Sequence, residues 1–181
     1  MPFRHFFERR RRERAASDLY LKLVTQAREP AFYASFGVPD TLEARFDMIV
    51  LHAWLLLRRL GTVKSETAKA LSQATFNLMF ADMDRNLREM GVTDLRVGKR
   101  VQRMAEAFYG RASAYDKGLE DGGDALSSAL TRNLYQGESV AGDHLDAMMA
   151  YIDKQVAHLG GLADQSLLDG NISFLSPEAH A

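Results

Sequence analysis

The sequence predicts an all-α protein, a single-domain bundle of about six to seven helices around a buried central helix. Apolar residues recur at intervals of three and four in four long segments, which is the spacing of one buried helical face. Only four prolines occur among the 181 residues, and no internal repeat indicates a solenoid. A chain of this length suits one domain, because it buries about 70% of its unfolded surface on folding.

Residues 1–16 form a basic N-terminal arm, in which aromatic residues precede a run of arginines. Two interpretations stay open for this arm. It is either a disordered terminus or a peripheral anchor, whose rings enter the headgroup layer while its arginines meet anionic lipid. No apolar stretch follows as in a secretory signal. The membrane-binding residues would be Phe3, Phe6, Phe7, Arg9, Arg10, Arg11 and Arg12.

The helical domain is predicted over residues 17–161 and begins with a helix over 17–29, which Pro30 ends. The central helix is expected over 40–60, with Asp40 or Thr41 as its N-terminal cap. It is apolar on nearly all sides, so neighbouring helices should surround it. It is too short in apolar residues to span a membrane, since the run 48–57 is interrupted by His52 and a spanning helix needs about twenty.

The stretch from Phe76 to Arg111 is predicted to form two amphipathic helices joined by a short corner. The first begins after Ser65 and ends near Gly91, and Thr93 or Asp94 should cap the second, which runs to about residue 117. Cations gather on the outer side of the second helix. This face is either simply solvated, with nearby carboxylates compensating the charge, or it binds a partner. The partner-binding residues would be Arg96, Lys99, Arg100, Arg103 and Arg111, and the compensating carboxylates would be Asp82, Asp84, Glu89, Asp94 and Glu106.

Two further helices are expected over 124–135 and 139–159, before a stop at Gly160 and Gly161. Residues 162–181 form a hydrophobic C-terminal tail, which either packs as a turn of helix or serves as a partner-binding strip. Residues 1–30 carry eight Lys and Arg against four Asp and Glu, whereas residues 119–181 carry two against ten. The two ends of the chain should therefore present surfaces of opposite charge.

The sequence contains few signs of catalysis. It has no cysteine, no glycine-rich phosphate loop, no G-x-S-x-G turn and no H-E-x-x-H motif. We expect His52 to be a neutral, hydrogen-bonded core residue. The alternative is a pocket near His52 and Trp54 in a helical-bundle enzyme or a binder of small lipophilic ligands. We expect no catalytic residue, no metal, no cofactor and no sequence-specific contact with nucleic acid.

Two segments carry a family resemblance: LREMGVTDLRVGKRVQRMAEAFYGRASAY and, before it, FYASFGVPDTLEARFDMIVLHAWLLLRRL. Together they resemble the ubiquinol–cytochrome c chaperone family over roughly residues 19–135. The resemblance implies a helical, non-enzymatic assembly factor of the respiratory cytochrome bc1 complex. It implies cytochrome b or other bc1 subunits as partners, with the ribosome as a further one. It also implies a cytoplasmic protein, peripheral at the inner face of the membrane, or on the matrix side in a mitochondrion.

Overall fold

The computed structural model describes residues 2–177, and their side chains from residue 6 onward. This part of the chain contains helices and no strand, which confirms the all-α prediction. Six helices have eleven residues or more, and α2 and α8 have five each. The elements are α1 (Pro2–Ala27), α2 (Pro30–Ala34), α3 (Leu42–Thr62), α4 (Glu66–Glu89), α5 (Asp94–Asp121), α6 (Gly123–Asn133), α7 (Gly142–Gly161) and α8 (Asp164–Leu168).

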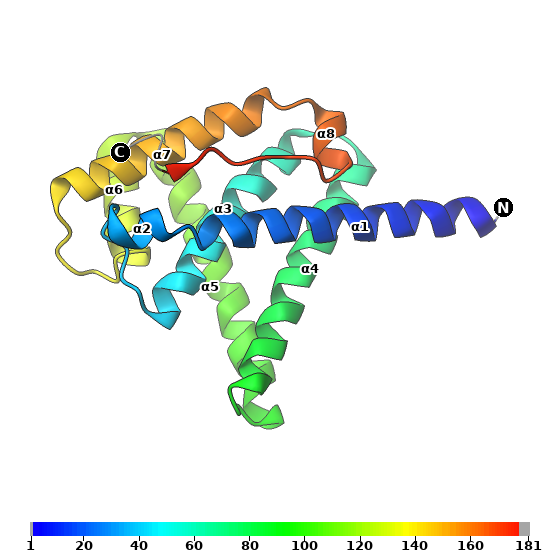
Figure 1. Cartoon of the computed structure of the whole chain (residues 1–181), viewed down its shortest axis with the longest axis horizontal. Coiled ribbons are helices and arrows are strands. Elements are labelled where there is room, and N and C mark those ends of the chain that lie inside the picture. Colours follow the sequence, from blue (N-terminus) through cyan, green and yellow to red (C-terminus); the bar gives the residue numbers. More distant parts are fainter. Residues whose placement is uncertain (1, 178–181) are drawn as a thin grey trace.

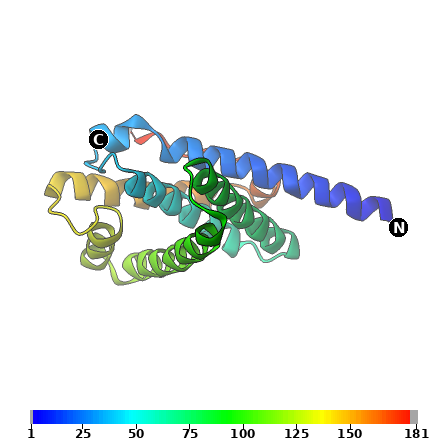
Figure 2. The same cartoon turned by 90° about the horizontal axis from the view of Figure 1, so that it is seen from below.

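Helix α3 is the centre of the bundle, as its sequence predicts. It packs against α1, α4, α5 and α7, and Figure 2 shows it between α1 on one side and α5 on the other. Its first turn is capped by Thr41, whose hydroxyl oxygen accepts a hydrogen bond from the amide of Ala44 at 3.1 Å. Burial of apolar side chains all round the helix removes its surface from water, which is the main stabilising contribution to the fold.

Helices α4 and α5 form an antiparallel hairpin that projects from the body of the molecule (Figure 1). Helix α4 is capped at its N-terminus by Ser65, whose hydroxyl oxygen accepts a hydrogen bond from the amide of Ala68 at 3.1 Å. The hairpin includes the stretch from Phe76 to Arg111 and ends at the corner around residues 90–93. It thus carries this corner away from the rest of the protein.

Helix α1 is continuous from Pro2 to Ala27 and crosses the expected boundary between an arm and a domain at residue 16. Ala15 and Ala16 are buried in the core, and Arg11 forms an ion pair with Asp169 at the end of α8. The arginine run has no apolar stripe of its own. The second half of the expected arm is therefore ordered by contacts with residues that are distant in the sequence. A local sequence pattern could not predict these contacts.

The chain after α8 runs back along α1 (Figure 1). The carbonyl oxygen of Gly170 accepts a hydrogen bond from Lys22 at 2.8 Å, and that of Leu175 accepts one from Gln26 at 2.7 Å. Ile172 is 5% exposed and belongs to the core. The C-terminal tail up to residue 177 therefore packs against the helical body.

Candidate partner-binding groove

The corner between α4 and α5 is held by backbone hydrogen bonds. Gly91 has a φ of +82°, and its amide donates to Arg88 while the amide of Val92 donates to Leu87, at 2.9 and 3.0 Å. This helix ending needs a residue with positive φ, which glycine adopts without strain. Thr93 occupies the N-cap position of α5, but its side chain forms no capping hydrogen bond. The prediction that Thr93 caps α5 is therefore wrong.

A groove of about 770 Å³ lies between this corner, α5 and Phe46 of α3. We call it the basic groove. All five cations predicted to bind a partner line it, and no aspartate or glutamate does. They are Arg96, Lys99, Arg100, Arg103 and Arg111. The sequence therefore predicted correctly that these cations share one face, since helical spacing alone determines it.

Four of these cations, at positions 96, 99, 100 and 103, are exposed and form no ion pair with a carboxylate of the described residues. Four of the five carboxylates that could compensate them bind other groups, and the fifth, Glu89, lines the adjoining pocket and forms no ion pair with these cations. These contacts are Asp82 with Arg85 and Tyr20, Asp84 and Asp94 with Arg88, and Glu106 with Gln102. Uncompensated guanidinium groups on one rigid face are suited to carboxylates or phosphates, which arginine binds through two parallel hydrogen bonds.

Arg111 differs from the other four cations. Its guanidinium forms an ion pair at 2.9 Å with Asp47 of α3, and these side chains are 23% and 3% exposed. The pair joins α5 to α3 beneath the basic groove. Burial raises the pKa of Asp47 to about 6 in spite of this arginine, because removal from water opposes the charged carboxylate more strongly than the ion pair favours it. Arg111 thus lines the groove, but the buried carboxylate of Asp47 neutralises its charge.

A largely apolar pocket of about 480 Å³, which Arg28, Glu43 and Glu89 also line, adjoins the basic groove between α3, α4 and α5. We call it the methionine pocket, after Met83, Met90 and Met104. The two cavities are neighbours, since they share four lining residues: Phe46, Met90, Arg100 and Met104. The sequence did not predict this pocket, because periodicity assigned the methionines to a buried stripe. In the structure Met90 is 53% exposed.

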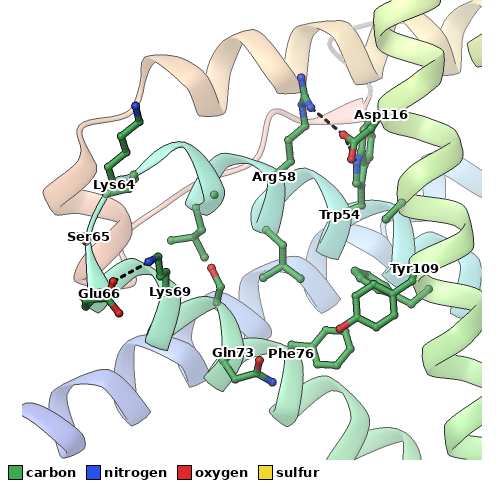
Figure 3. Close-up of a pocket in the computed structure, with 17 residues that line it drawn as sticks. Trp54, Arg58, Lys64, Ser65, Glu66, Lys69, Gln73, Phe76, Tyr109 and Asp116 are labelled. Carbon is green, nitrogen blue, oxygen red and sulfur yellow. Dashed lines mark hydrogen bonds and ion pairs between the residues drawn. The ribbon is translucent and has the colours of Figure 1, made fainter.

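A separate cleft, of about 850 Å³, lies on α3, α4 and α5 near the connection at residues 63–65 (Figure 3). We call it the Trp54 cleft. Trp54 lines it, and its indole N–H donates to Asp116 at 3.0 Å. Arg58 donates to the same carboxylate at 2.8 Å. His52 does not line this cleft, so the structure does not bring His52 and Trp54 together in it.

His52 of α3 is fully buried, and its ring packs against Phe32 of α2, Tyr151 of α7 and Phe174 of the C-terminal tail. Its Nδ1–H donates to the carbonyl oxygen of Met48 at 2.8 Å, and its Nε2 accepts from the hydroxyl of Tyr151 at 2.8 Å. Burial lowers the pKa of His52 to about 4. Both ring nitrogens are thus occupied in a neutral imidazole, as expected for a core histidine.

Residues 34–174 match the sequence profile of the ubiquinol-cytochrome C chaperone family. The chain belongs to this family. It is 26% identical to ubiquinol-cytochrome c reductase complex assembly factor 1 of Homo sapiens over 161 residues, which are 88% of this chain and 54% of the human protein. It is 28% identical to protein CBP3, mitochondrial, of Saccharomyces cerevisiae over 149 residues, which are 81% of this chain and 44% of the yeast protein.

The fold of this family is also known from the crystal structure of the Cbp3 homolog from Brucella abortus. That structure and this one superpose with a TM-score of 0.87 at 32% sequence identity, over 100% of both chains. The chain spans about half the length of the human and yeast family members named above. Sequence resemblance therefore identified the family correctly, and the match extends beyond the residues that carried it.

The residues predicted to bind a membrane lie in the N-terminal half of α1. Among them, the side chain of Phe3 is outside the described part of the structure. Phe6 and Phe7 are 42% and 66% exposed. The guanidinium of Arg10 lies 4.6 Å from the centre of the Phe6 ring. Arg11 points to α8, where it pairs with Asp169. The predicted set thus divides between an outer and an inner side of one helix.

Among the described residues, no helix combines the length and the apolar character that a membrane span requires. The same part of the chain contains no cluster of three or more His, Asp or Glu side chains placed to hold a metal ion.

Proposed function

We propose that this protein is a non-enzymatic chaperone in the assembly of the cytochrome bc1 complex, and that cytochrome b is its client. Membership of the family supports the assembly role, because relatives along most of this chain are named as assembly factors of that complex. The observation that carries the choice of surface is the basic groove with its four uncompensated cations. We assign client binding to this groove and to the methionine pocket beside it.

The proposed chaperone works at the inner face of a membrane, where its client is inserted. The exposed rings and arginines of α1 support this location, since basic residues near an anionic surface contribute about 1 kcal/mol each. Newly made cytochrome b reaches the same surface from the ribosome, which makes the ribosome a further proposed partner.

The test is affinity capture of bc1 subunits from detergent-treated membranes by the tagged protein. We expect Arg100→Glu combined with Arg103→Glu to reduce the recovered cytochrome b strongly. Both side chains are exposed, so the melting temperature should barely change. The loss should be smaller at high salt, because exposed charges are screened within about 10 Å at 0.1 M.

The matched control is Lys64→Glu combined with Lys69→Glu, which reverses two charges at the Trp54 cleft instead. It should leave capture intact. If the control abolishes capture and the groove variant does not, the client binds at the Trp54 cleft. If both variants capture as well as the parent at low salt, the basic groove is only a solvated face.

A further inference from the structure

We infer that the basic groove and the methionine pocket together bind one amphipathic helix with an acidic edge. This inference rests on the proposed function and specifies the chemistry of the client segment. Its apolar face would lie in the methionine pocket. Carboxylates spaced by three or four residues would lie along one border of that face and meet the cations of α5.

The charge of the groove selects an acidic ligand. Four cations line it without a carboxylate in the lining, and the fifth, Arg111, is already paired with Asp47. A basic ligand would add to an uncompensated positive field, and a neutral one would leave that field unchanged. Carboxylates would remove the repulsion among the cations and gain bidentate hydrogen bonds from arginine.

The spacing of the cations indicates a helical ligand. Arg96, Arg100 and Arg103 follow one another at intervals of four and three residues, so they lie along one line of α5. At 1.5 Å per residue this line is about 10 Å long. A helix lying beside α5 repeats its side chains with the same rise. Carboxylates at intervals of three or four residues would therefore reach successive cations.

The methionine pocket supplies the apolar half of the site. Its lining combines Met83, Met90 and Met104 with Leu42, which is 55% exposed, and Phe46. Glu43 and Glu89 also line it, so the carboxylates of the ligand would have to lie on the side of α5, away from these two glutamates. Methionine side chains are unbranched and polarizable, so they adapt to apolar surfaces of different shape. A chaperone that holds a folding client benefits from this adaptability. Free phosphate and the backbone of a nucleic-acid duplex would use the cations but bring no aliphatic side chains to fill the pocket, whereas unpaired bases could enter it, which is why a single-stranded oligonucleotide is included in the test.

The experiment measures the binding of fluorescent, helix-stapled peptides of about 16 residues, a length near 24 Å that matches the groove along α5. The first peptide has a leucine face bordered by three glutamates at intervals of four and three residues. The second replaces these glutamates by lysines. The third keeps the composition of the first but places the glutamates opposite the leucine face. Binding to the full chain is followed by fluorescence anisotropy at low and at high salt.

We expect the first peptide to bind about tenfold or more tightly than the other two, which corresponds to about 1.4 kcal/mol. Arg100→Glu with Arg103→Glu should remove this preference. Leu42→Asp should weaken the binding of the first peptide, because it removes an apolar side chain from the lining of the methionine pocket. It should not unfold α3, because a carboxylate in the first turn of a helix is favourable. Lys64→Glu with Lys69→Glu should change nothing.

Equal binding of the acidic and basic peptides would overturn the inference, and so would an unchanged affinity in the groove variant. Tighter binding of a short single-stranded oligonucleotide than of the acidic peptide would assign the groove to phosphates. The proposed function has a separate outcome. If the peptide fails but the groove variant loses cytochrome b, only the recognition chemistry is wrong; if the peptide binds but no bc1 subunit is captured, only the client is wrong.

Discussion

His52 illustrates at the scale of a residue how the core decides a protonation state. The ring donates to one carbonyl oxygen and accepts from one hydroxyl, and no described carboxylate contacts it. Burial removes the ring from water and disfavours the charged imidazolium, which explains why the pKa of His52 lies near 4 rather than near 6.5, although the hydrogen bond to the carbonyl oxygen of Met48 acts in the opposite direction.

This shift predicts a contribution of His52 to the pH dependence of stability. Because the folded pKa lies below the unfolded value of 6.5, the stabilisation is complete above pH 6.5 and is lost as the pH falls toward 4. Between pH 7 and pH 4.5 the free energy of unfolding should lose roughly 2 to 3 kcal/mol through this residue. Urea denaturation of the parent and of His52→Gln at both pH values measures it, and the difference between the two proteins should shrink at pH 4.5.

Asp47 acts in the opposite direction and makes the comparison with a variant necessary. Its folded pKa of about 6 lies above the unfolded value of 3.8. Its contribution to stability is therefore complete below pH 3.8 and is lost as the pH rises through 6. Asp47 is present in both the parent and His52→Gln, so its contribution cancels in their difference. A difference that stays constant between pH 7 and pH 4.5 would contradict the role given to His52.

The residue scale also shows what sequence reasoning can achieve at the candidate site. Helical spacing placed the cations of α5 on one face, because that spacing is a local property of one helix. The partner of Arg111 was not predictable in this way. Asp47 lies on another helix, and its contact with Arg111 depends on how α3 and α5 are rotated against each other.

At the scale of elements, the boundaries predicted from sequence were best where a side chain acts locally. Thr41 and Ser65 accept the expected N-terminal hydrogen bonds, and Gly91 ends α4 with a positive φ. Helix α7 includes Gly160 and Gly161, where the sequence predicted a stop. Both have φ in the ordinary range, and Arg59 of α3 donates to the carbonyl oxygens of Leu159 and Leu162 on either side of them, which helps to hold this end of α7 against the weak intrinsic preference of glycine against helix.

The contact between the C-terminal tail and α1 gives a second testable element. Gly170 has a φ of +72°, and a Cβ atom there would lie 2.9 Å from backbone atoms of Ala15. We expect Gly170→Ala to destabilise the protein by about 1–3 kcal/mol through this overlap. Positive φ adds about 1–2 kcal/mol more for a residue with a side chain. Urea denaturation followed by helical circular dichroism measures the loss.

Gly137 offers the matched control for this substitution. Its φ is +77°, close to that of Gly170, but a Cβ atom there would meet no atom within 4 Å. Gly137→Ala should therefore lose only the part that comes from backbone conformation. Equal losses in the two variants would mean that the tail moves away from α1 at little cost, and that its packing does not stabilise the fold.

At the scale of the whole molecule, two features extend from the body, the α4–α5 hairpin and the N-terminal half of α1 (Figure 1). The hairpin carries the proposed client site. The outward side of α1 carries Phe7, Arg10, Arg14 and Leu21, at intervals of three, four and seven residues that place them along one line. Phe7 and Leu21 are 66% and 65% exposed. We propose that this line, rather than the whole arginine run, contacts the membrane.

The membrane contact is tested by flotation of the purified protein with vesicles. Arg10→Glu with Arg14→Glu should reduce binding to anionic vesicles, since each of the two arginines contributes about 1 kcal/mol near such a surface. Substitution is preferable to deletion of residues 1–14, because deletion would also remove the ion pair of Arg11 with Asp169. The helical signal and the melting temperature should not change, since Arg10 and Arg14 are exposed.

Two comparisons decide the origin of this binding. Neutral vesicles should retain little protein of either kind, because the arginines meet no anionic lipid there, and rising salt should release the parent from anionic vesicles. Lys64→Glu with Lys69→Glu reverses the same charge at the start of α4 instead of on α1 and should bind as the parent does. Similar losses in both charge-reversal variants would indicate that net charge alone brings the protein to the vesicle. Undiminished binding of the α1 variant would assign the membrane contact to another surface, of which the exposed corner of the hairpin, with Leu95 90% exposed, is the next to test.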